Sequence, residues 1–248
     1  MIKGSVASIE TMGLADGPGI RTVVFLNGCK LRCKYCHNPE MQEMMDLNIT
    51  PNELCEKIIR NKPYFKRNNG GVTFSGGEPL LQKKFLIECF KILKCENIHV
   101  ALDTCGVGNG DYEEILSYVD LVLLDIKHVL DKGYYYITGH SIDDSLRFIE
   151  VLNKLNKKIW IRQVIVPGIM DNDEYIDKLV DVLLKIKNIE RVDFLPYHKL
   201  GESKYEKLNR EIPFKNIEAM DKDKCDSLYN RFLKKYFEKG GKFLKLDD

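Results

Sequence analysis

The chain carries six short, almost continuous apolar runs, separated by longer stretches in which apolar residues recur at helical spacing. The runs are TVVFL from Thr22, GVTFS from Gly71, HVALDT from His99, LVLLDI from Leu121, IWIRQVIV from Ile159 and RVDFLP from Arg191. Runs that are rich in Val, Ile, Leu and Phe and rarely alternate with polar residues are typical of strands buried on both faces. The pattern therefore predicts six strands of a parallel sheet.

Five helices are predicted between and after these runs. In the first, TPNEL, Thr50 is the N-cap, Pro51 occupies the first helical position and Glu53 completes a capping box. The other four have one apolar face and cover residues 82–96, 144–155, 173–187 and 222–239.

This order of elements predicts an α/β fold. Repeated βα units imply right-handed crossovers and a parallel sheet or barrel, and six strands are too few to close an eight-stranded barrel. The chain has no linker rich in Gly, Pro or Ser, so residues 1–248 are expected to form a single domain. Residues 197–219 are polar and irregular, which predicts a loop covering the C-terminal edge of the sheet.

Composition and charge narrow the function classes. Lys and Arg total 38 and Asp and Glu total 37, and the net charge of +1 gives no case for a nucleic-acid partner. No apolar run has the length of a membrane span, and the N-terminus lacks the apolar core of a signal peptide. We therefore expect a cytoplasmic protein with no membrane partner and no disulfides.

The eight cysteines divide into two groups. Cys29, Cys33 and Cys36 lie within eight residues of one another. The other five are expected to be small buried hydrophobes, and they are Cys55, Cys89, Cys95, Cys105 and Cys225. Cys105 is also kept as a functional candidate because its neighbours in the segment DTCG are polar.

Polar or glycine-rich segments follow or end each predicted strand. Along the chain they are the cysteine loop, SGGEP, DTCG, DIK, an arginine followed by VPG, and PYH. In parallel α/β folds, ligands bind at the C-terminal ends of the strands. Six such ends would meet at one rim, so the sequence predicts a single ligand site there.

The spacing of the clustered cysteines, C-x3-C-x2-C, leaves two kinds of metal site open. Zinc sites usually pair two C-x2-C units, and no second pair exists here, although His37 offers a Cys3His alternative. A 4Fe-4S cluster held by three thiolates would leave one iron without a protein ligand. Such an open position suits a catalytic site, where a substrate or cofactor coordinates the metal.

The segment CKLRCKYC, with the aromatic Tyr35 before the last cysteine, resembles the signature of the radical S-adenosylmethionine (SAM) superfamily. The resemblance implies a partial (β/α)6 barrel of the TIM type, in agreement with the strand count. It also implies that Cys29, Cys33 and Cys36 hold a 4Fe-4S cluster whose open iron binds SAM. One electron from the cluster then breaks the sulfonium bond, and a 5′-deoxyadenosyl radical forms.

A narrower resemblance rests on several segments in the same order. DGPGIRTVVFLNGC from Asp16, YCHN, SGGEPLLQ, LDTCG, LLDIK, WIRQVIVPG and FLPYHKLGESKYEKL are similar to the family of pyruvate formate-lyase activating enzymes. The resemblance implies an oxidoreductase that abstracts hydrogen from one glycine of pyruvate formate-lyase and leaves a glycyl radical. It further implies flavodoxin or ferredoxin as the electron donor.

The resemblance also assigns the predicted site residues. Asp16, near the incoming glycine, Lys127 and Arg162, whose partner would be a cofactor carboxylate, are expected to be catalytic. Residues implied to bind the cofactor are Tyr35, Cys36, His37, Gly76, Gly77, Glu78, Asp125, Ile126, Lys127, Arg162 and His198. A monovalent-cation site is implied at Asp103, Thr104, the Leu123 carbonyl and Asp125.

Two departures from the family pattern bear on these expectations. Cys105 stands where relatives commonly have Asn, which affects one local contact. Only 36 residues separate Cys36 from Thr73, and their single cysteine, Cys55, cannot build an auxiliary cluster. This favours the pyruvate formate-lyase class over other glycyl-radical activases. Those activases, a radical SAM enzyme acting on a small molecule, and a zinc-binding module are the alternatives.

Overall fold

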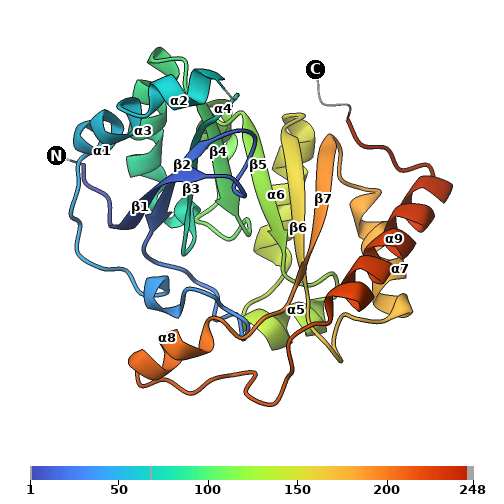
Figure 1. Cartoon of the computed structure of the whole chain (residues 1–248). Coiled ribbons are helices and arrows are strands. Elements are labelled where there is room, and N and C mark those ends of the chain that lie inside the picture. Colours follow the sequence, from blue (N-terminus) through green and yellow to red (C-terminus); the bar gives the residue numbers. More distant parts are fainter. Residues whose placement is uncertain (1, 68, 245–248) are drawn as a thin grey trace.

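The computed structural model describes residues 2–67 and 69–244, and its centre is one open, seven-stranded sheet (Figure 1). The strands lie side by side in chain order. Six of them run parallel and confirm the six predicted runs: β2 (Arg21–Leu26), β3 (Gly71–Gly76), β4 (His99–Thr104), β5 (Leu121–Ile126), β6 (Lys158–Ile165) and β7 (Ile189–Pro196).

The first strand, β1 (Val6–Gly13), was not predicted. It pairs antiparallel with β2 at the edge of the sheet, and most of its side chains are exposed or half-buried. An edge strand of this kind needs no dense apolar run, because only part of it faces the core. Its connection to β2 folds back so that the Thr73 hydroxyl of β3 donates a hydrogen bond to the Asp16 carbonyl at 2.5 Å.

All five predicted helices are present, and they are α1 (Pro51–Ile59), α3 (Lys83–Cys95), α6 (Asp143–Lys154), α7 (Asp173–Leu183) and α9 (Lys222–Glu238). The predicted capping box forms: the Thr50 hydroxyl accepts from the Glu53 amide, and the Glu53 carboxylate accepts from the Thr50 amide at 2.8 Å. In the parallel part of the sheet, the predicted helices pack on the face that carries the main apolar core.

Several short helical segments were not predicted, because one or two turns give too little periodicity to recognise. They are α2 (Lys62–Arg67), α4 (Glu113–Ser117), α5 (Asp131–Thr138), α8 (Glu202–Lys207) and the 3-10 turns η1 (Pro39–Met41) and η2 (Pro79–Gln82). The expectation that residues 197–219 are wholly irregular is therefore wrong, since α8 lies within them. Figure 1 shows α5 and α8 at the same end of the sheet.

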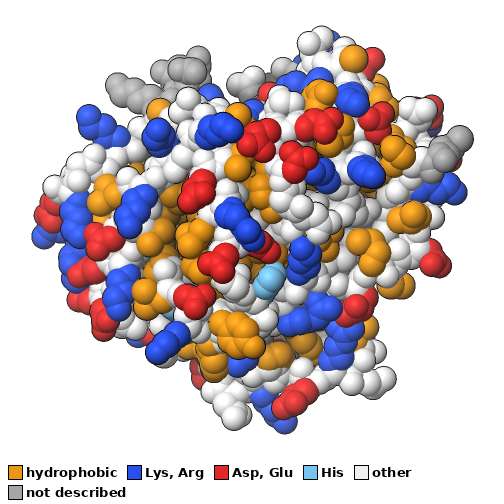
Figure 2. Space-filling model, turned by 180° about the vertical axis from the view of Figure 1, so that it is seen from behind, with side chains coloured by type: hydrophobic (Ala, Val, Ile, Leu, Met, Phe, Trp, Pro, Cys, Tyr) orange, Lys and Arg blue, Asp and Glu red, His pale blue; other side chains and the backbone are white. Residues whose placement is uncertain are grey.

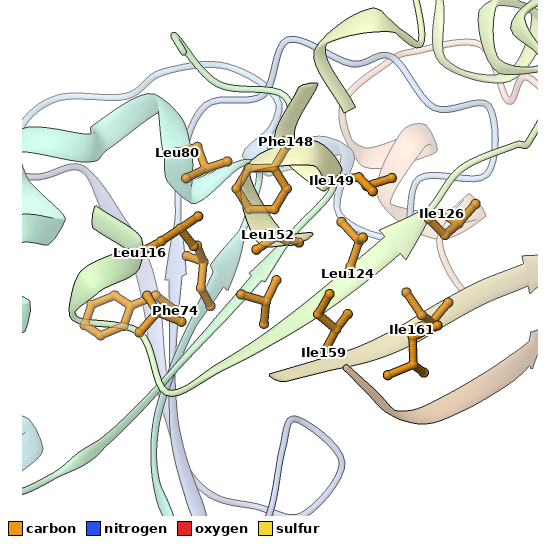
Figure 3. Close-up of a cluster of buried hydrophobic side chains, with 14 of the residues drawn as sticks. Phe74, Leu80, Leu116, Leu124, Ile126, Phe148, Ile149, Leu152, Ile159 and Ile161 are labelled. Carbon is orange, nitrogen blue, oxygen red and sulfur yellow. The ribbon is translucent and has the colours of Figure 1, made fainter. Parts of the chain in front are cut away.

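The two faces of the sheet carry different side chains. On the helix-covered face, Leu124 and Ile161 of neighbouring strands pack with Phe148 of α6 in the main apolar core (Figure 3). On the opposite face, a small separate cluster of Ala101, Leu121, Leu123 and Trp160 fills the interior of the partial barrel. Two positions further along β4, β5 and β6, the same face carries the charged residues Asp103, Asp125 and Arg162.

Arg21, at the start of β2, lies fully buried beside the barrel interior. Its guanidinium donates to the Thr73 hydroxyl at 3.0 Å and to the Pro18 carbonyl at 3.4 Å, and it contacts His99 Nδ1 at 3.1 Å. Because arginine only donates, the His99 nitrogen must act as the acceptor. Through these three contacts, the Arg21 side chain ties the β1–β2 connection to β3 and β4.

Three further features bear on the expectations, and they are the surface charges, the character of the helices and the burial of the scattered cysteines. Positive, negative and apolar side chains are interspersed on the face drawn in Figure 2, as the small net charge suggests. No helix among the described residues has both the length and the apolar character needed to cross a membrane. Cys55, Cys89, Cys105 and Cys225 are buried as predicted, whereas Cys95 is exposed at the end of α3, so that prediction was wrong.

The His99 contact makes stability depend on pH. Burial, followed by the Arg21 charge, lowers the pKa of His99 from 6.5 to about 4. The resulting stabilisation is present above pH 6.5 and is lost as the pH falls toward 4. Between pH 7.5 and pH 5, His99 should lower the free energy of unfolding by about 2 kcal/mol. Urea unfolding of the wild type and His99→Gln at both pH values checks this, and equal losses in the two proteins would contradict it.

Candidate functional site

The three clustered cysteines meet at one cavity beyond the end of β2. Cys29, Cys33 and Cys36 line this cavity, whose volume is about 220 Å³. Backbone hydrogen bonds fix the loop that carries them: Cys29 N donates to the Gln42 carbonyl at 2.9 Å, and Cys36 N donates to the Cys33 carbonyl at 3.0 Å. The thiols are therefore held in place by backbone as well as by their own packing.

The cysteine loop also pairs with α5, which is remote in sequence. Arg32 N donates to the Thr138 carbonyl at 2.8 Å, and Lys34 N donates to the Ile137 carbonyl at 2.9 Å. Leu31 and Cys33, which flank Arg32 in the loop, form a small apolar cluster with Cys105 and Val107. The last turn of α5 thus forms part of the wall behind the thiols.

The three thiols of the loop are free and are at least half-buried. All eight cysteines are free thiols, and burial raises the pKa of Cys29 to about 11 and that of Cys33 to about 12. Within residues 2–67 and 69–244, no three His, Cys, Asp or Glu side chains surround a point that fits one metal ion. In a 4Fe-4S cluster, each thiolate would bind a different iron.

The glycine-rich end of β3 forms the opposite wall. Gly76 and Gly77 line the cavity, and Gly76 has a φ of 116°, which favours glycine. A Cβ on Gly77 would lie 2.2 Å from the Gly28 carbonyl oxygen. The bare backbone is thus required by the close approach of the cysteine loop, a protein contact that the sequence did not reveal.

Glu78 is not among the residues that line the cavity, and its predicted contact with the cofactor stays a prediction. Its fully buried carboxylate accepts hydrogen bonds from the Thr104 hydroxyl at 2.6 Å, from Cys105 N and Sγ, both at 2.9 Å, and from Leu80 N at 3.1 Å. Burial raises the pKa of Glu78. Glu78 therefore fastens the loop after β4 to the end of β3 and holds Cys105 beside the cluster cysteines.

Arg162 bridges three carboxylates inside the barrel. Its guanidinium binds Asp103, contacts Asp125 Oδ1 at 3.1 Å and approaches Asp16 Oδ1 at 3.7 Å. The Ser75 hydroxyl donates a further hydrogen bond to Asp103 at 2.6 Å. The partners of Arg162 in the structure are thus carboxylates of the protein itself, and its predicted contact with a cofactor carboxylate stays a prediction.

Lys127 joins the same ionic group at the rim. Its ammonium lies 2.9 Å from Asp125 Oδ2. Burial opposes ionisation of Asp125, yet Lys127 and Arg162 outweigh it and lower the pKa of that carboxyl. Burial likewise opposes the charge on Lys127, and Asp125 raises its pKa well above the usual value. Asp125 and Lys127 both line the cavity, so a fixed pair of opposite charges faces a bound molecule.

The aromatic candidates lie along one side of the cavity. Tyr35 lines it, and its hydroxyl donates to the Lys127 carbonyl at 3.4 Å. His37 lines the same cavity and meets His198 edge-to-face, with ring centroids 4.9 Å apart. His198 itself lines a smaller adjoining cavity of about 20 Å³, which also includes His37. The three rings therefore continue the site toward α8.

Some of the remaining predicted site residues line the cavity, and others do not. Asp103 and Thr104 line the cavity, whereas the side chain of Leu123 lies in the interior apolar cluster. Ile126 lies in the main core, and neither it nor Arg162 lines the cavity. The cation site at Asp103, Thr104, Leu123 and Asp125 stays a prediction. Lining residues that the sequence did not single out are Leu31, Asn38, Gln42, Ser75 and Val164.

Comparison with known proteins identifies the family. The model of the radical SAM superfamily matches residues 23–183. A pyruvate formate-lyase-activating enzyme of Clostridium pasteurianum is 53% identical over 239 residues, which are 96% of this chain and 100% of that protein. The chain belongs to the family of pyruvate formate-lyase-activating enzymes. A pyruvate formate-lyase-activating enzyme of Staphylococcus epidermidis is 39% identical, and the match covers 92% of this chain and 95% of that protein.

Solved structures agree with radical SAM membership at the level of the fold. SuiB of Streptococcus suis, bound to its precursor peptide SuiA, has a TM-score of 0.68 at 18% identity, covering 89% of this chain and 47% of SuiB. A domain of a pyruvate-formate lyase-activating enzyme from Bacteroides vulgatus has a TM-score of 0.56 at 21% identity. The match covers 71% of this chain and 98% of that domain. Membership in the radical SAM family implies a 4Fe-4S cluster and SAM as cofactors, and the three free thiols fit the cluster.

The Arg162 bridge should dominate the stability of the barrel interior. Arg162→Gln leaves Asp103 and Asp125 without their shared cation and should lower the free energy of unfolding by about 3 kcal/mol. Adding Asp103→Asn should recover part of this loss, because it removes one uncompensated charge. Urea unfolding measures both effects. Arg147→Gln, which breaks the exposed pair with Asp144, serves as the control, and an equal effect there would contradict the prediction.

Proposed function

We propose that this chain activates pyruvate formate-lyase by removing a hydrogen atom from the α-carbon of one of its glycines. The observation that carries the proposal is the meeting of three free thiols, the Gly76–Gly77 backbone and the Asp125–Lys127 pair at one cavity. They meet in a chain that is 53% identical, over 96% of its length, to an activating enzyme of that class. The product is a glycyl radical in the partner.

In this proposal the cofactors supply the radical chemistry, and the protein binds and orients them. When bound, the cluster and SAM supply a one-electron reductive cleavage whose organic radical abstracts the hydrogen atom. Cys29, Cys33 and Cys36 hold the cluster and leave one iron to SAM. The Gly76–Gly77 backbone, Lys127 and Asp125 orient the polar groups of SAM, and Tyr35, His37 and His198 surround its adenine. A monovalent cation at Asp103, Thr104, the Leu123 carbonyl and Asp125 belongs to the same proposal.

Asp16 and the interior charges act on the glycine segment. Asp16 is half-buried, and its carboxylate faces Arg162 across the barrel interior. Burial, followed by the charge of Asp103, raises the pKa of Asp16. The contact with Arg162 and the partial burial support a role for Asp16 as a hydrogen-bonding group beside the incoming glycine. We further propose that flavodoxin or ferredoxin delivers the electron and that the enzyme works in the cytoplasm.

Spectroscopy of the activated partner tests the proposal. The chain is reconstituted anaerobically with iron and sulfide, reduced with dithionite and mixed with SAM and pyruvate formate-lyase. The expected result is a glycine-centred radical signal on the partner. Cys33→Ser should abolish both SAM cleavage and this signal, because it removes one of three cluster thiolates. Cys95→Ser, an exposed cysteine outside the cavity, is the matched control and should behave as the wild type.

The other outcomes separate the alternatives. A colourless, zinc-replete chain that does not cleave SAM would overturn the proposal. Cleavage without a radical on any glycyl enzyme would favour a small-molecule substrate. A radical on a different glycyl enzyme alone would assign the chain to that partner.

Asp16→Asn tests the proposed contact with the glycine segment. Loss of a charge-assisted hydrogen bond should raise the KM for a glycyl peptide of the partner about tenfold. The KM for SAM should change much less, because Asp16 does not line the cavity. Steady-state kinetics with the peptide measure both constants, and Asp46→Asn, an exposed carboxylate, is the control. Equal changes in the two KM values would argue against a substrate contact.

A further inference from the structure

In the described part of the chain, the hydrogen-bond partners of the fully buried Arg21 are uncharged groups. Its guanidinium donates to the Thr73 hydroxyl at 3.0 Å and to the carbonyls of Pro18 and Val72, and it contacts His99 Nδ1 at 3.1 Å. Burial lowers the pKa of Arg21 to about 10, so the side chain keeps its charge at neutral pH. Arginine is rarely buried so completely without a carboxylate partner, and its place here calls for a specific explanation.

The Thr73 hydroxyl links Arg21 to the β1–β2 connection, residues 14–20. Because arginine only donates, the hydroxyl oxygen must accept from Arg21. Its own proton is free for a second hydrogen bond, which it donates to the Asp16 carbonyl at 2.5 Å. Arg21 and Thr73 thus form a hydrogen-bonded relay, the Arg21–Thr73 relay, that ends on the backbone of Asp16.

The connection also packs closely on its supports beyond Asp16. Gly17, which has a φ of 126°, lies against the guanidinium, since a Cβ on Gly17 would be 3.3 Å from Arg21 Nε. At the end of the connection, the Ile20 carbonyl accepts from Gly71 N at 3.1 Å. The backbone that follows Asp16 is therefore held by Arg21 and by the start of β3.

The carboxylate of Asp16 is held less directly than its backbone. Its Oδ1 lies 3.7 Å from Arg162, which is longer than a hydrogen bond. Arg162 is also engaged with Asp103 and Asp125. Attraction at this distance does not fix the orientation of a side chain. The place of the Asp16 carboxylate in the barrel interior consequently depends on where the Asp16 backbone is anchored.

We propose that Arg21 and Thr73 are positioning residues that set where the Asp16 carboxylate meets the glycine segment of the partner. They act through the Asp16 backbone rather than by contact with the substrate. This role accounts for a cation buried among uncharged groups, because its charge strengthens the hydrogen bonds that anchor the connection. The inference rests on the proposed function, which brings the glycine beside Asp16.

Hydrogen exchange of the cluster-loaded chain tests the anchor without any glycyl partner. Thr73→Val removes the hydroxyl at nearly constant volume. Amide exchange in residues 14–20, followed by mass spectrometry, should become about fivefold faster, the factor that one hydrogen bond of typical strength contributes. Thr73→Ser keeps a hydroxyl and should exchange at the wild-type rate.

Thr22→Val is the matched control for this measurement. Thr22 is a buried threonine of the neighbouring strand β2, and its hydroxyl accepts from the Asn61 side chain at 3.1 Å. The substitution therefore also removes a buried, hydrogen-bonded hydroxyl, but one outside the Arg21–Thr73 relay. Exchange in residues 14–20 should stay at the wild-type rate in Thr22→Val.

Steady-state kinetics test the consequence for the substrate. Thr73→Val should raise the KM for a glycyl peptide of the partner about fivefold, and Thr73→Ser should restore it. The KM for SAM should change little, because neither Arg21 nor Thr73 lines the cavity of the cysteine loop. In an Asp16→Asn background the effect of Thr73→Val on the peptide KM should disappear, because the relay acts through the Asp16 carboxylate.

Unchanged exchange in residues 14–20, or an unchanged peptide KM, in folded Thr73→Val would overturn the inference. Faster exchange together with a raised peptide KM that Thr73→Ser restores supports it. If Thr73→Val does not fold, Thr73→Cys replaces it. A thiol is a weak donor and a weak acceptor, so both quantities should change in the same direction.

The Asp16→Asn variant separates the two levels of the argument. A wild-type peptide KM in Asp16→Asn contradicts the proposed contact between Asp16 and the glycine segment. A raised KM in Asp16→Asn, together with a wild-type KM in Thr73→Val, contradicts only the role of Arg21 and Thr73.

Discussion

The charged interior of the partial barrel depends on one ionic interaction, the bridge that Arg162 makes between carboxylates. A single guanidinium, Arg162 of β6, binds Asp103 of β4 and Asp125 of β5 and faces Asp16 of the β1–β2 connection. Buried carboxylates without such a partner would be too costly to keep ionised. The bridge therefore allows the sheet to present charged groups at its rim, and it fixes Asp125 for its contact with Lys127. The polar half of the site thus rests on Arg162 together with Lys127.

The apolar half of the site depends on contacts between distant segments. The cysteine loop is held by Gln42 on one side and by α5 on the other, and its glycine neighbour Gly28 lies against Gly77. These contacts fix the positions of the three thiols. Glu78 adds to this support, because its carboxylate accepts from Cys105 N and so secures the loop after β4 beside the thiols.

Much of the fold was predictable because its signals are local. The β2–β7 strands are dense apolar runs, and the five predicted helices have repeated apolar faces or a capping box. The β1 edge strand and the short helices were missed because a half-exposed strand and one or two helical turns leave weak patterns. Cys95 was placed inside because residue type alone does not reveal which side of α3 faces solvent.

The sequence by itself determined the chemistry of the site: the cysteine spacing, the glycine-rich strand end and the charged strand ends mark a radical SAM enzyme. These signals are local, since ligand type and spacing are read along the chain. Tertiary structure decided which groups are engaged with one another. It paired Arg162 with protein carboxylates, joined Glu78 to the loop after β4 and left the Tyr134 hydroxyl without a hydrogen-bond partner among the described residues. Such partnerships join residues from different strands and helices, and no one-dimensional pattern records them.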